Sequence, residues 1–344
     1  MNASTKRMGL GAASLLIAAA AWLPAAHRLF QPRLADYTGA GLPPQVRALA
    51  AQQLQLWTDP ASKSNEVQRM RSSNAEWDFM ARTYFVLALA NMALRHPEEK
   101  PAYLAVMDAI LEETLRLEKE HGVYYFLMDY ARASPFKSKG ARSLFQDGEI
   151  ALMLGARQWL EEKAEYKAIL RERIGLIVTA MEEGPVLCGE SYPDECWMFC
   201  NCVALAAVKI SDALERQDHA EFFNRWIAAA KAQLTDRETG LLISSFSFDG
   251  SPGDGPEGSS IWMAAHCLQL IDPAFAEDQY RRAKTELAGH FLGFGYAREW
   301  PRTWEGAMDV DSGPIIPLFK ISAGSSGLAF VGASAFGDSD YLQA

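Results

Sequence analysis

Residues with acid–base or nucleophilic side chains gather where the sequence predicts helices to begin. Asp78 and Tyr84 open one nearly apolar stretch, Glu149 opens a second, and Ser191 and Cys200 flank the start of a third. Elimination of water needs one group to protonate the leaving hydroxyl and another to remove a proton from carbon. Two carboxyl groups whose pKa values differ because of burial can divide these tasks. The set therefore suits a dehydration.

Each of these side chains has an expected role in such a reaction. Glu149 lies at the start of an apolar helix, where burial raises the pKa of a carboxyl group, so we expect it to be the general acid. Asp78, held by Arg82 or Tyr84, is expected to stay ionised and to act as the base. Tyr84 would orient the substrate hydroxyl or share its proton. Cys200 would line the cavity or carry a second proton.

Simpler structural interpretations exist for the same residues. Asp78 and Arg82 are four residues apart, so on a helix they could only be an ion pair. A cysteine on an apolar helix is usually a small hydrophobic residue. A helix N-terminus, however, lowers the pKa of a thiol, which would make Cys200 reactive.

The chain has five cysteines, and four of them lie between Cys188 and Cys202. In an exported protein this cluster indicates a disulfide, with at least one thiol left free by the odd number. The cluster contains no C-x-x-C pair and no histidine, so we expect no metal site. The chain also lacks the G-x-S-x-G, H-E-x-x-H and phosphate-loop motifs, and we expect no cofactor.

Residues 1–26 form a segment separate from the fold. Lys6 and Arg7 precede an apolar run that ends at Pro24-Ala25-Ala26, the pattern of a signal peptide with small residues at the cleavage site. If the segment is not cleaved, residues 8–26 would tether the protein to the membrane. Both interpretations place the body, residues 27–344, in the periplasm or otherwise outside the cytoplasmic membrane.

Apolar residues at helical spacing recur through residues 27–344, which we treat as a single domain. Nearly all-apolar segments alternate with amphipathic ones, as expected when buried helices alternate with half-buried ones. Short strands are predicted only at residues 122–127 and 241–248. The predicted helices cover residues 46–56, 76–94, 102–120, 144–162, 164–181, 195–214, 220–234, 258–270, 274–291 and 321–335.

This alternation predicts an all-α fold, an (α/α)6-type toroid in which an inner ring of helices is wrapped by an outer ring. An α-solenoid would show a fixed sequence repeat, and none is present. A complete toroid of six hairpins needs twelve helices, two more than predicted. We therefore expect a ring that is incomplete, or a sequence truncated at its C-terminus.

Three segments carry a resemblance to a known family. Pro193-Asp194 followed by Cys200-Asn201, and Asp78 followed by Tyr84, resemble motifs of the linalool dehydratase/isomerase family. Gly148-Glu149 followed by Leu152-Met153 is similar to the family's segment with a catalytic histidine. The resemblance implies an exported α/α toroid that forms rings of subunits. It also implies cofactor-independent dehydration or isomerisation of a terpenoid alcohol.

The resemblance assigns the site to Asp78, Tyr84 and Cys200, with Glu149 where the family has histidine and Ser191 where it has a first cysteine. Linalool itself is therefore in question as the substrate. Around these catalytic residues we expect the substrate to contact a second set of side chains, namely Trp77, Ser191, Asp194, Cys196 and Asn201.

Two other classes of function remain open. Toroids also host glycoside hydrolases and polysaccharide lyases, which use paired carboxylates and aromatic side chains. Trp300 and Trp304 offer aromatic walls for such a site, and carboxylates are offered by Asp147, Glu149, Asp194, Glu257, Asp309 and Asp311. A non-catalytic exported binding protein is the third class. The net charge of −10 and the absence of a basic tract exclude nucleic acid as an expected partner.

Overall fold

The computed structural model describes residues 3–306, 308, 310, 312–316 and 320–344. The described chain is mostly helical, which confirms the predicted all-α class. The helices are α1 (Ala3–Phe30), α2 (Leu34–Thr38), α3 (Pro44–Thr58), α4 (Pro60–Ser73), α5 (Ala75–Arg95), α6 (Lys100–His121), α7 (Leu144–Leu160), α8 (Ala164–Glu183), α9 (Met198–Glu215), α10 (Ala220–Gln233), α11 (Gly258–Leu268), α12 (Pro273–Glu286), α13 (Ala323–Ala335) and α14 (Ser339–Gln343), with 3-10 turns at Pro97–Glu99 and Asp129–Ala133.

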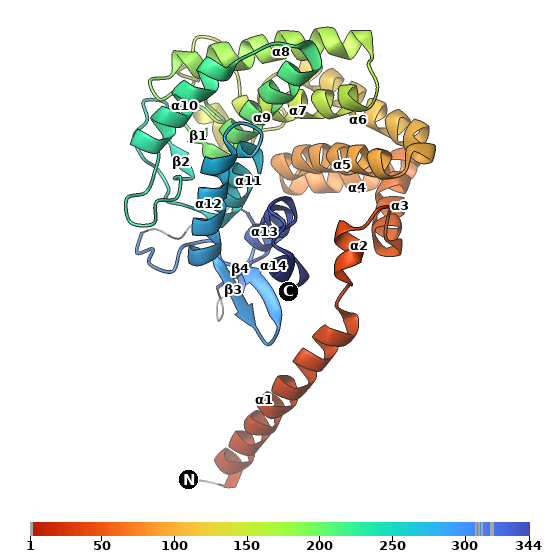
Figure 1. Ribbon diagram of the computed structural model, residues 1–344, viewed down its shortest axis with the longest axis vertical. Helices are drawn as coiled ribbons and strands as arrows, with labels where there is room; N and C mark the ends of the chain where they lie inside the picture. The colour runs from red at the N-terminus through yellow and green to blue at the C-terminus, as the bar shows by residue number, and fades with distance from the viewer. Residues whose placement is uncertain (1–2, 307, 309, 311, 317–319) are drawn as a thin grey trace.

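The odd-numbered helices from α5 to α13 form an arc. Each packs on the next: α5 on α7, α7 on α9, α9 on α11 and α11 on α13. The helices between them, α6, α8, α10 and α12, lie on the outside of the arc (Figure 1). Burial follows the same pattern, because α7 and α9 are buried on nearly every face, whereas α6, α10 and α12 bury one stripe.

The strands are short and lie in segments that connect the helices. β1 (Cys196–Trp197) pairs antiparallel with β2 (Ser245–Phe246), and β3 (Ala288–Phe291), β4 (Phe294–Ala297), β6 (Ile321–Ser322) and β5 (Ile315–Ile316) form a sheet in that order. The prediction of a strand at 122–127 was wrong. Gly122, with φ of +79°, ends α6 and turns the chain into bends.

At two predicted helices a strand replaces one end of the helix. Helix α12 ends at Glu286, and the chain continues into β3. Helix α9 begins at Met198, because Cys196 and Trp197 pair with β2 instead. The helical periodicity runs through both boundaries, so tertiary pairing decided them.

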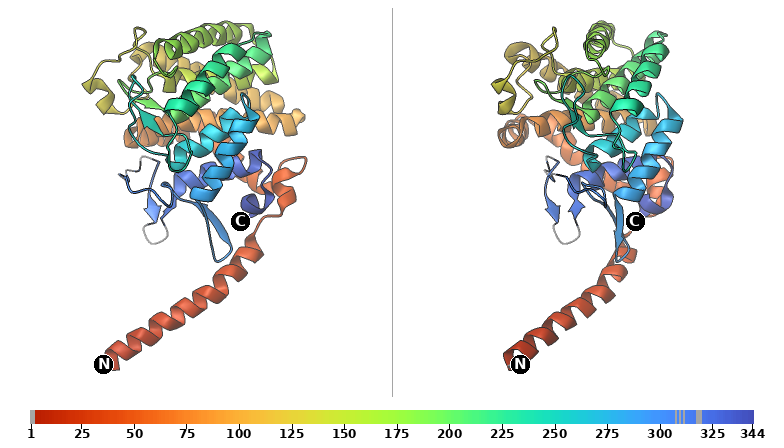
Figure 2. Two further views of the ribbon diagram at one scale, coloured as in Figure 1. Left: turned by 60° about the vertical axis from the view of Figure 1, so that its left-hand side comes forward. Right: turned by 90° about the vertical axis from the view of Figure 1, so that its left-hand side faces the viewer.

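Helix α1 stands away from the body of the protein (Figure 2). Its residues Thr5–Phe30 are long and apolar enough to cross a membrane, and none of that stretch is buried in the protein. This is compatible with the predicted signal sequence or anchor. The helix continues past residue 26 to Phe30, so the structure shows no break at the predicted cleavage position.

Candidate functional site

A cavity of about 700 Å³ lies inside the arc, between the starts of α5, α9, α11 and α13. Its volume falls in the range of small-molecule sites. Most of its wall is apolar or aromatic, with rings supplied by Trp77, Tyr84, Tyr130, Tyr192, Trp197 and Phe199. The predicted residues Trp77, Tyr84 and Cys200 belong to this wall.

Glu76 and Tyr192 form a hydrogen-bonded pair in the cavity wall. The backbone N–H of Met128 donates to the Tyr192 hydroxyl at 3.0 Å. The hydroxyl in turn donates to Oε1 of Glu76. Burial, and then the negative charge of Glu76, raise the pKa of Tyr192, so the tyrosine stays protonated. The pair therefore presents a carboxylate that is fixed in direction by a neutral donor.

The ring of Tyr192 is held in place by a second aromatic contact. Tyr130 stacks on it with ring centroids 4.8 Å apart and an interplanar angle of 12°. The Tyr130 hydroxyl donates to Oε1 of Glu195 at 3.3 Å, and the indole N–H of Trp197 donates to the same oxygen. These contacts fix the position of the aromatic side chains in this wall, as a site that orients a substrate requires.

A second carboxyl group, that of Glu257, lies in the cavity wall at the N-cap of α11. Glu257 is 3% exposed, and its backbone N–H donates to the Ser244 hydroxyl at 2.7 Å. Next to it, Ser259 donates its hydroxyl and its backbone N–H to the buried Glu299. The start of α11 thus brings polar groups to a cavity that is otherwise apolar.

Glu149 lies in α7, buried behind the cavity wall, and is not one of the residues that line the cavity. Burial raises the pKa of Glu149 from 4.5 to about 7, and the Thr83 hydroxyl opposes the shift. Its negative charge contributes to raised pKa values at Tyr84 and Cys200, which do line the cavity. Glu149 therefore has the raised pKa that the sequence predicted. Its carboxyl group, however, lies behind the residues that line the cavity.

The raised pKa of Glu149 makes a testable contribution to stability. An unfolded Glu149 ionises near 4.5, whereas the folded protein keeps the proton until about 7. Stability is therefore lost as the pH rises from 4.5 to 7, by about 3 kcal/mol in total. We expect Glu149→Gln to remove this loss, so that the variant gains stability relative to wild type across that window. Urea unfolding from pH 4 to 8 measures the difference. Parallel curves for the two proteins would contradict it, and Glu165→Gln, an exposed position on α8, is the control.

Asp78 is not among the residues that line the cavity. Its carboxylate accepts a hydrogen bond from Nε of Arg82 at 2.8 Å, and Arg71 lies 3.7 Å away. Asp78 and Arg82 are both 2% exposed. The ion-pair interpretation therefore describes the contacts of Asp78 in this structure, and its carboxylate is directed to Arg82 rather than to the cavity.

Four other predicted residues shape the loop around the cavity rather than line it. The Ser191 hydroxyl accepts from the backbone of Trp197 at 3.2 Å, and Asn201 exchanges hydrogen bonds with both backbone groups of Gly189. Cys196 is buried in β1. Asp194 has φ of +59° and turns the loop, with its carboxylate 3.6 Å from the ammonium of Lys137.

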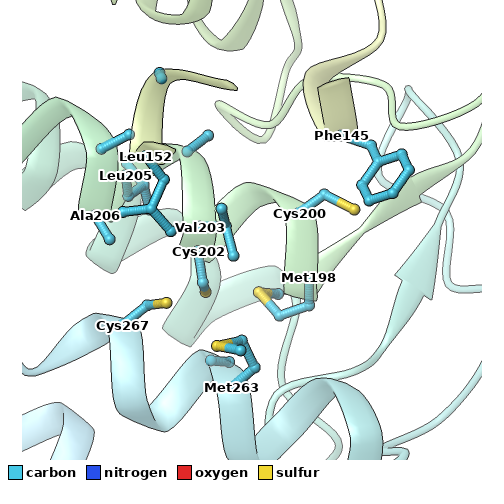
Figure 3. Packing of buried hydrophobic residues seen from close by; sticks show 14 of the residues in the cluster. Phe145, Leu152, Met198, Cys200, Cys202, Val203, Leu205, Ala206, Met263 and Cys267 are labelled. Atoms are coloured by element: carbon cyan, nitrogen blue, oxygen red, sulfur yellow. The ribbon is translucent and has the colours of Figure 1, made fainter. Parts of the chain in front are cut away.

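All five cysteines are free and buried. Figure 3 shows Cys202 near Met198, Met263 and Cys267 in the core, and Cys200 close to Phe145. Burial raises the pKa of Cys188 to about 12, and it also raises the pKa of Cys200. The idea that a helix N-terminus lowers the pKa of Cys200 was wrong, because desolvation of the thiolate is the larger effect.

The buried thiols are expected to be unreactive towards thiol reagents in the folded protein. Ellman's reagent at pH 8 should detect no fast-reacting thiol in the native state and all five after unfolding in guanidinium without reductant, because only the thiolate is reactive. Three or fewer thiols in the unfolded protein would reveal a disulfide. A thiol that reacts quickly in the native protein would show that one of these side chains is accessible.

Helical geometry explains why Glu76 belongs to the site and Asp78 does not. Successive residues of an α-helix are about 100° apart, so Glu76, Met80 and Tyr84 share one face of α5 and all three line the cavity. Asp78, six residues before Tyr84, points to another side. Glu257 was predicted only as a carboxylate of the carbohydrate alternative, and Tyr192 was not predicted as a site residue. Both lie in or beside loops whose path the sequence does not show.

Of the carboxylates and aromatic walls expected for the carbohydrate alternative, Glu257 lies in the cavity wall, and the others that the structure describes do not. Trp300 and Trp304 stack on each other at 5.4 Å and are not among the residues that line the cavity. Asp147 is buried in an ion-pair network with Arg142 and Arg173. Asp309 and Asp311 lie outside the described residues. Across the described part of the chain, no group of three or more His, Cys, Asp or Glu side chains could hold a metal ion.

The described part of the chain is thus mostly helical and has an aromatic-walled, carboxylate-bearing cavity. No protein-family model matches the sequence, and no curated protein matches it.

Proposed function

We propose that this protein is a cofactor-independent lyase or isomerase that removes or shifts the hydroxyl of a small apolar, terpenoid-like alcohol. The observation that carries the proposal is the aromatic-walled cavity with the hydrogen-bonded Glu76–Tyr192 pair in its wall. An apolar wall favours a hydrocarbon skeleton, and polar groups placed on that wall suit acid–base work on one hydroxyl.

The proposed reaction divides the proton transfers between two groups of residues. The Tyr84 hydroxyl donates its proton to the substrate hydroxyl, the C–O bond breaks and water leaves. Tyr84 recovers a proton from Glu149, whose pKa of about 7 keeps part of it protonated at neutral pH. The Glu76 carboxylate takes the proton from the neighbouring carbon, and the C–H electrons form the double bond. In an isomerisation, water instead adds to another carbon of the allylic cation before any carbon proton is lost, and Glu76 takes the proton that the added water releases. Proton exchange with water then deprotonates Glu76 and reprotonates Glu149.

The arrangement of helices supports the related proposal that the body is an incomplete α/α toroid, distantly similar to linalool dehydratase/isomerase. The inner helices follow one another in chain order, and α5 and α13, at the two ends of the arc, both contribute to the cavity wall. Tyr84 and Cys200, two of the residues that the resemblance assigns, lie in that wall. A ring of identical subunits stays a prediction.

We also propose that α1 holds the body outside the cytoplasmic membrane. Lys6 and Arg7 precede the apolar run, and positive residues remain on the cytoplasmic side. The body would then lie on the other side. Partition into vesicles by flotation, before and after treatment with a signal peptidase, measures whether the segment anchors or is removed.

The activity is tested directly on a panel of ten-carbon allylic alcohols. The purified full-length protein, kept under reducing conditions, should convert at least one of them to a hydrocarbon or a rearranged alcohol, measured by gas chromatography. Heat-unfolded protein is the control for uncatalysed loss. Failure with every alcohol of the panel would count against this proposal.

One observation keeps a carbohydrate-active enzyme as the second candidate. Glu76 and Glu257 come from different helices and both face the cavity, as the paired carboxylates of a glycosidase do. An assay with soluble oligosaccharides separates the two functions. Cleavage that depends on both Glu76 and Glu257, with no turnover of alcohols, would establish the carbohydrate enzyme. Binding without turnover of either class would indicate an exported binding protein.

A further inference from the structure

The β3–β4 hairpin has an apolar tip that emerges beside the base of α1. Phe291 and Phe294 flank the tip and are 41% and 40% exposed. The hairpin leaves the body on the side from which α1 leaves (Figures 1 and 2). The rings of His27 and Phe294 lie 4.3 Å apart, so the tip contacts the base of α1 directly.

The turn residues at the tip are unusual for a hairpin in water. Leu292 and Gly293 both have positive φ, +51° and +93°. Two-residue turns of this kind favour Asn-Gly or Asp-Gly, and a bulky apolar residue with positive φ is rare. A leucine is therefore present where a polar residue would be better for both the backbone and solubility.

The remainder of the hairpin is firmly attached to the body. The backbone N–H of Gly295 donates to the carbonyl of Ala344 at 2.9 Å, and the Tyr341 hydroxyl donates to the carbonyl of Tyr296 at 2.7 Å. Helix α14 thus fixes the strands, and the tip is carried at a set position relative to His27.

The length of the apolar run places that position at a membrane surface. Residues 8–26 are nineteen uncharged residues, which as a helix extend about 28 Å. The hydrocarbon core of a bilayer is about 30 Å thick. If Lys6 and Arg7 mark one surface, His27 and the neighbouring hairpin tip lie at the other. Trp22, 72% exposed, then lies near that surface, where tryptophan is enriched.

We propose that the tip of the β3–β4 hairpin, Phe291 to Phe294, inserts into the outer surface of the lipid bilayer that α1 crosses. The hairpin is a second contact with the membrane, and it sets the orientation of the body on it. This inference rests on the proposed anchoring by α1. Two contacts fix an orientation that a single helix with a flexible connection would leave free.

The test must measure the position of the hairpin tip itself, because α1 alone would keep the protein bound to vesicles. Phe291→Cys in the full-length chain is labelled with an environment-sensitive fluorophore and reconstituted into phosphatidylcholine vesicles; the five native thiols are buried and should not react. Glu165→Cys, exposed at the start of α8, is the matched control. We expect the label at residue 291 to emit at shorter wavelength and to lose most of its emission to shallow spin-labelled lipids, with no change at residue 165.

Each outcome has a distinct meaning. If the protein floats with the vesicles but the label at residue 291 behaves like that at residue 165, the hairpin proposal is overturned and the anchor survives. Equal quenching at both positions also overturns it. If the protein does not float at all, the proposed anchor fails and the hairpin proposal fails with it. Unchanged thermal unfolding of both variants confirms that labelling did not disturb the fold.

Discussion

Glu76→Gln is expected to lower kcat by a factor of about 10²–10⁴, the usual contribution of a positioned general base. The amide is nearly the same size, and the Tyr192 hydroxyl can still donate to its oxygen. The cavity should therefore keep its shape and its affinity for the alcohol. Steady-state kinetics on whichever alcohol the panel identifies would show the loss in kcat with KM nearly unchanged.

Tyr192→Phe distinguishes the orienting role of Tyr192 from the proton transfer that Glu76 performs. The phenyl ring keeps its stack on Tyr130, but the hydrogen bond to Glu76 and the acceptor for the Met128 N–H are lost. A smaller fall in kcat, about tenfold, would fit a residue that orients the base, since one hydrogen bond to a charged group contributes about 1.5 kcal/mol or more. Glu165→Gln should leave turnover unchanged. Full activity of Glu76→Gln would move the search for a base to Glu257.

The apolar periodicity predicted the helices well because burial sets it directly. The buried α7 and α9, for example, are rich in apolar residues, and they pack against each other as neighbours in the inner arc. The ends of helices were less predictable. At Cys196 and at Ala288 the helical pattern continues, but pairing with a distant segment turns the backbone into a strand.

Only some of the residues predicted for the site line the cavity. Tyr84, Trp77 and Cys200 line the cavity, because their faces of α5 and α9 point into the arc. Asp78 could have been excluded from helical geometry alone, and Glu76 could have been chosen by the same rule. Tyr192 could not, because its approach to Glu76 depends on a loop closed by a distant contact with Met128.

Asp78→Ala is expected to lower the free energy of unfolding by about 3 kcal/mol, because removal of one partner leaves a buried charge poorly compensated. Arg82 is 2% exposed and loses its 2.8 Å hydrogen bond to Asp78. Glu113, 3.2 Å from the same guanidinium, remains as a partner, which keeps the loss below the upper end of the usual range. Urea unfolding at pH 7 measures the change.

The same variant tests which interpretation of Asp78 is right, because a structural pair and a catalytic base predict different results. If Asp78 only holds Arg82, the fraction of Asp78→Ala that is folded should turn over substrate at nearly the wild-type kcat. Glu66→Ala, which removes an exposed partner of Arg69, controls for loss of an ion pair and should leave the unfolding midpoint unchanged. A folded, stable Asp78→Ala protein without activity would return Asp78 to the role of base. The proposal that Glu76 performs that step would then be wrong.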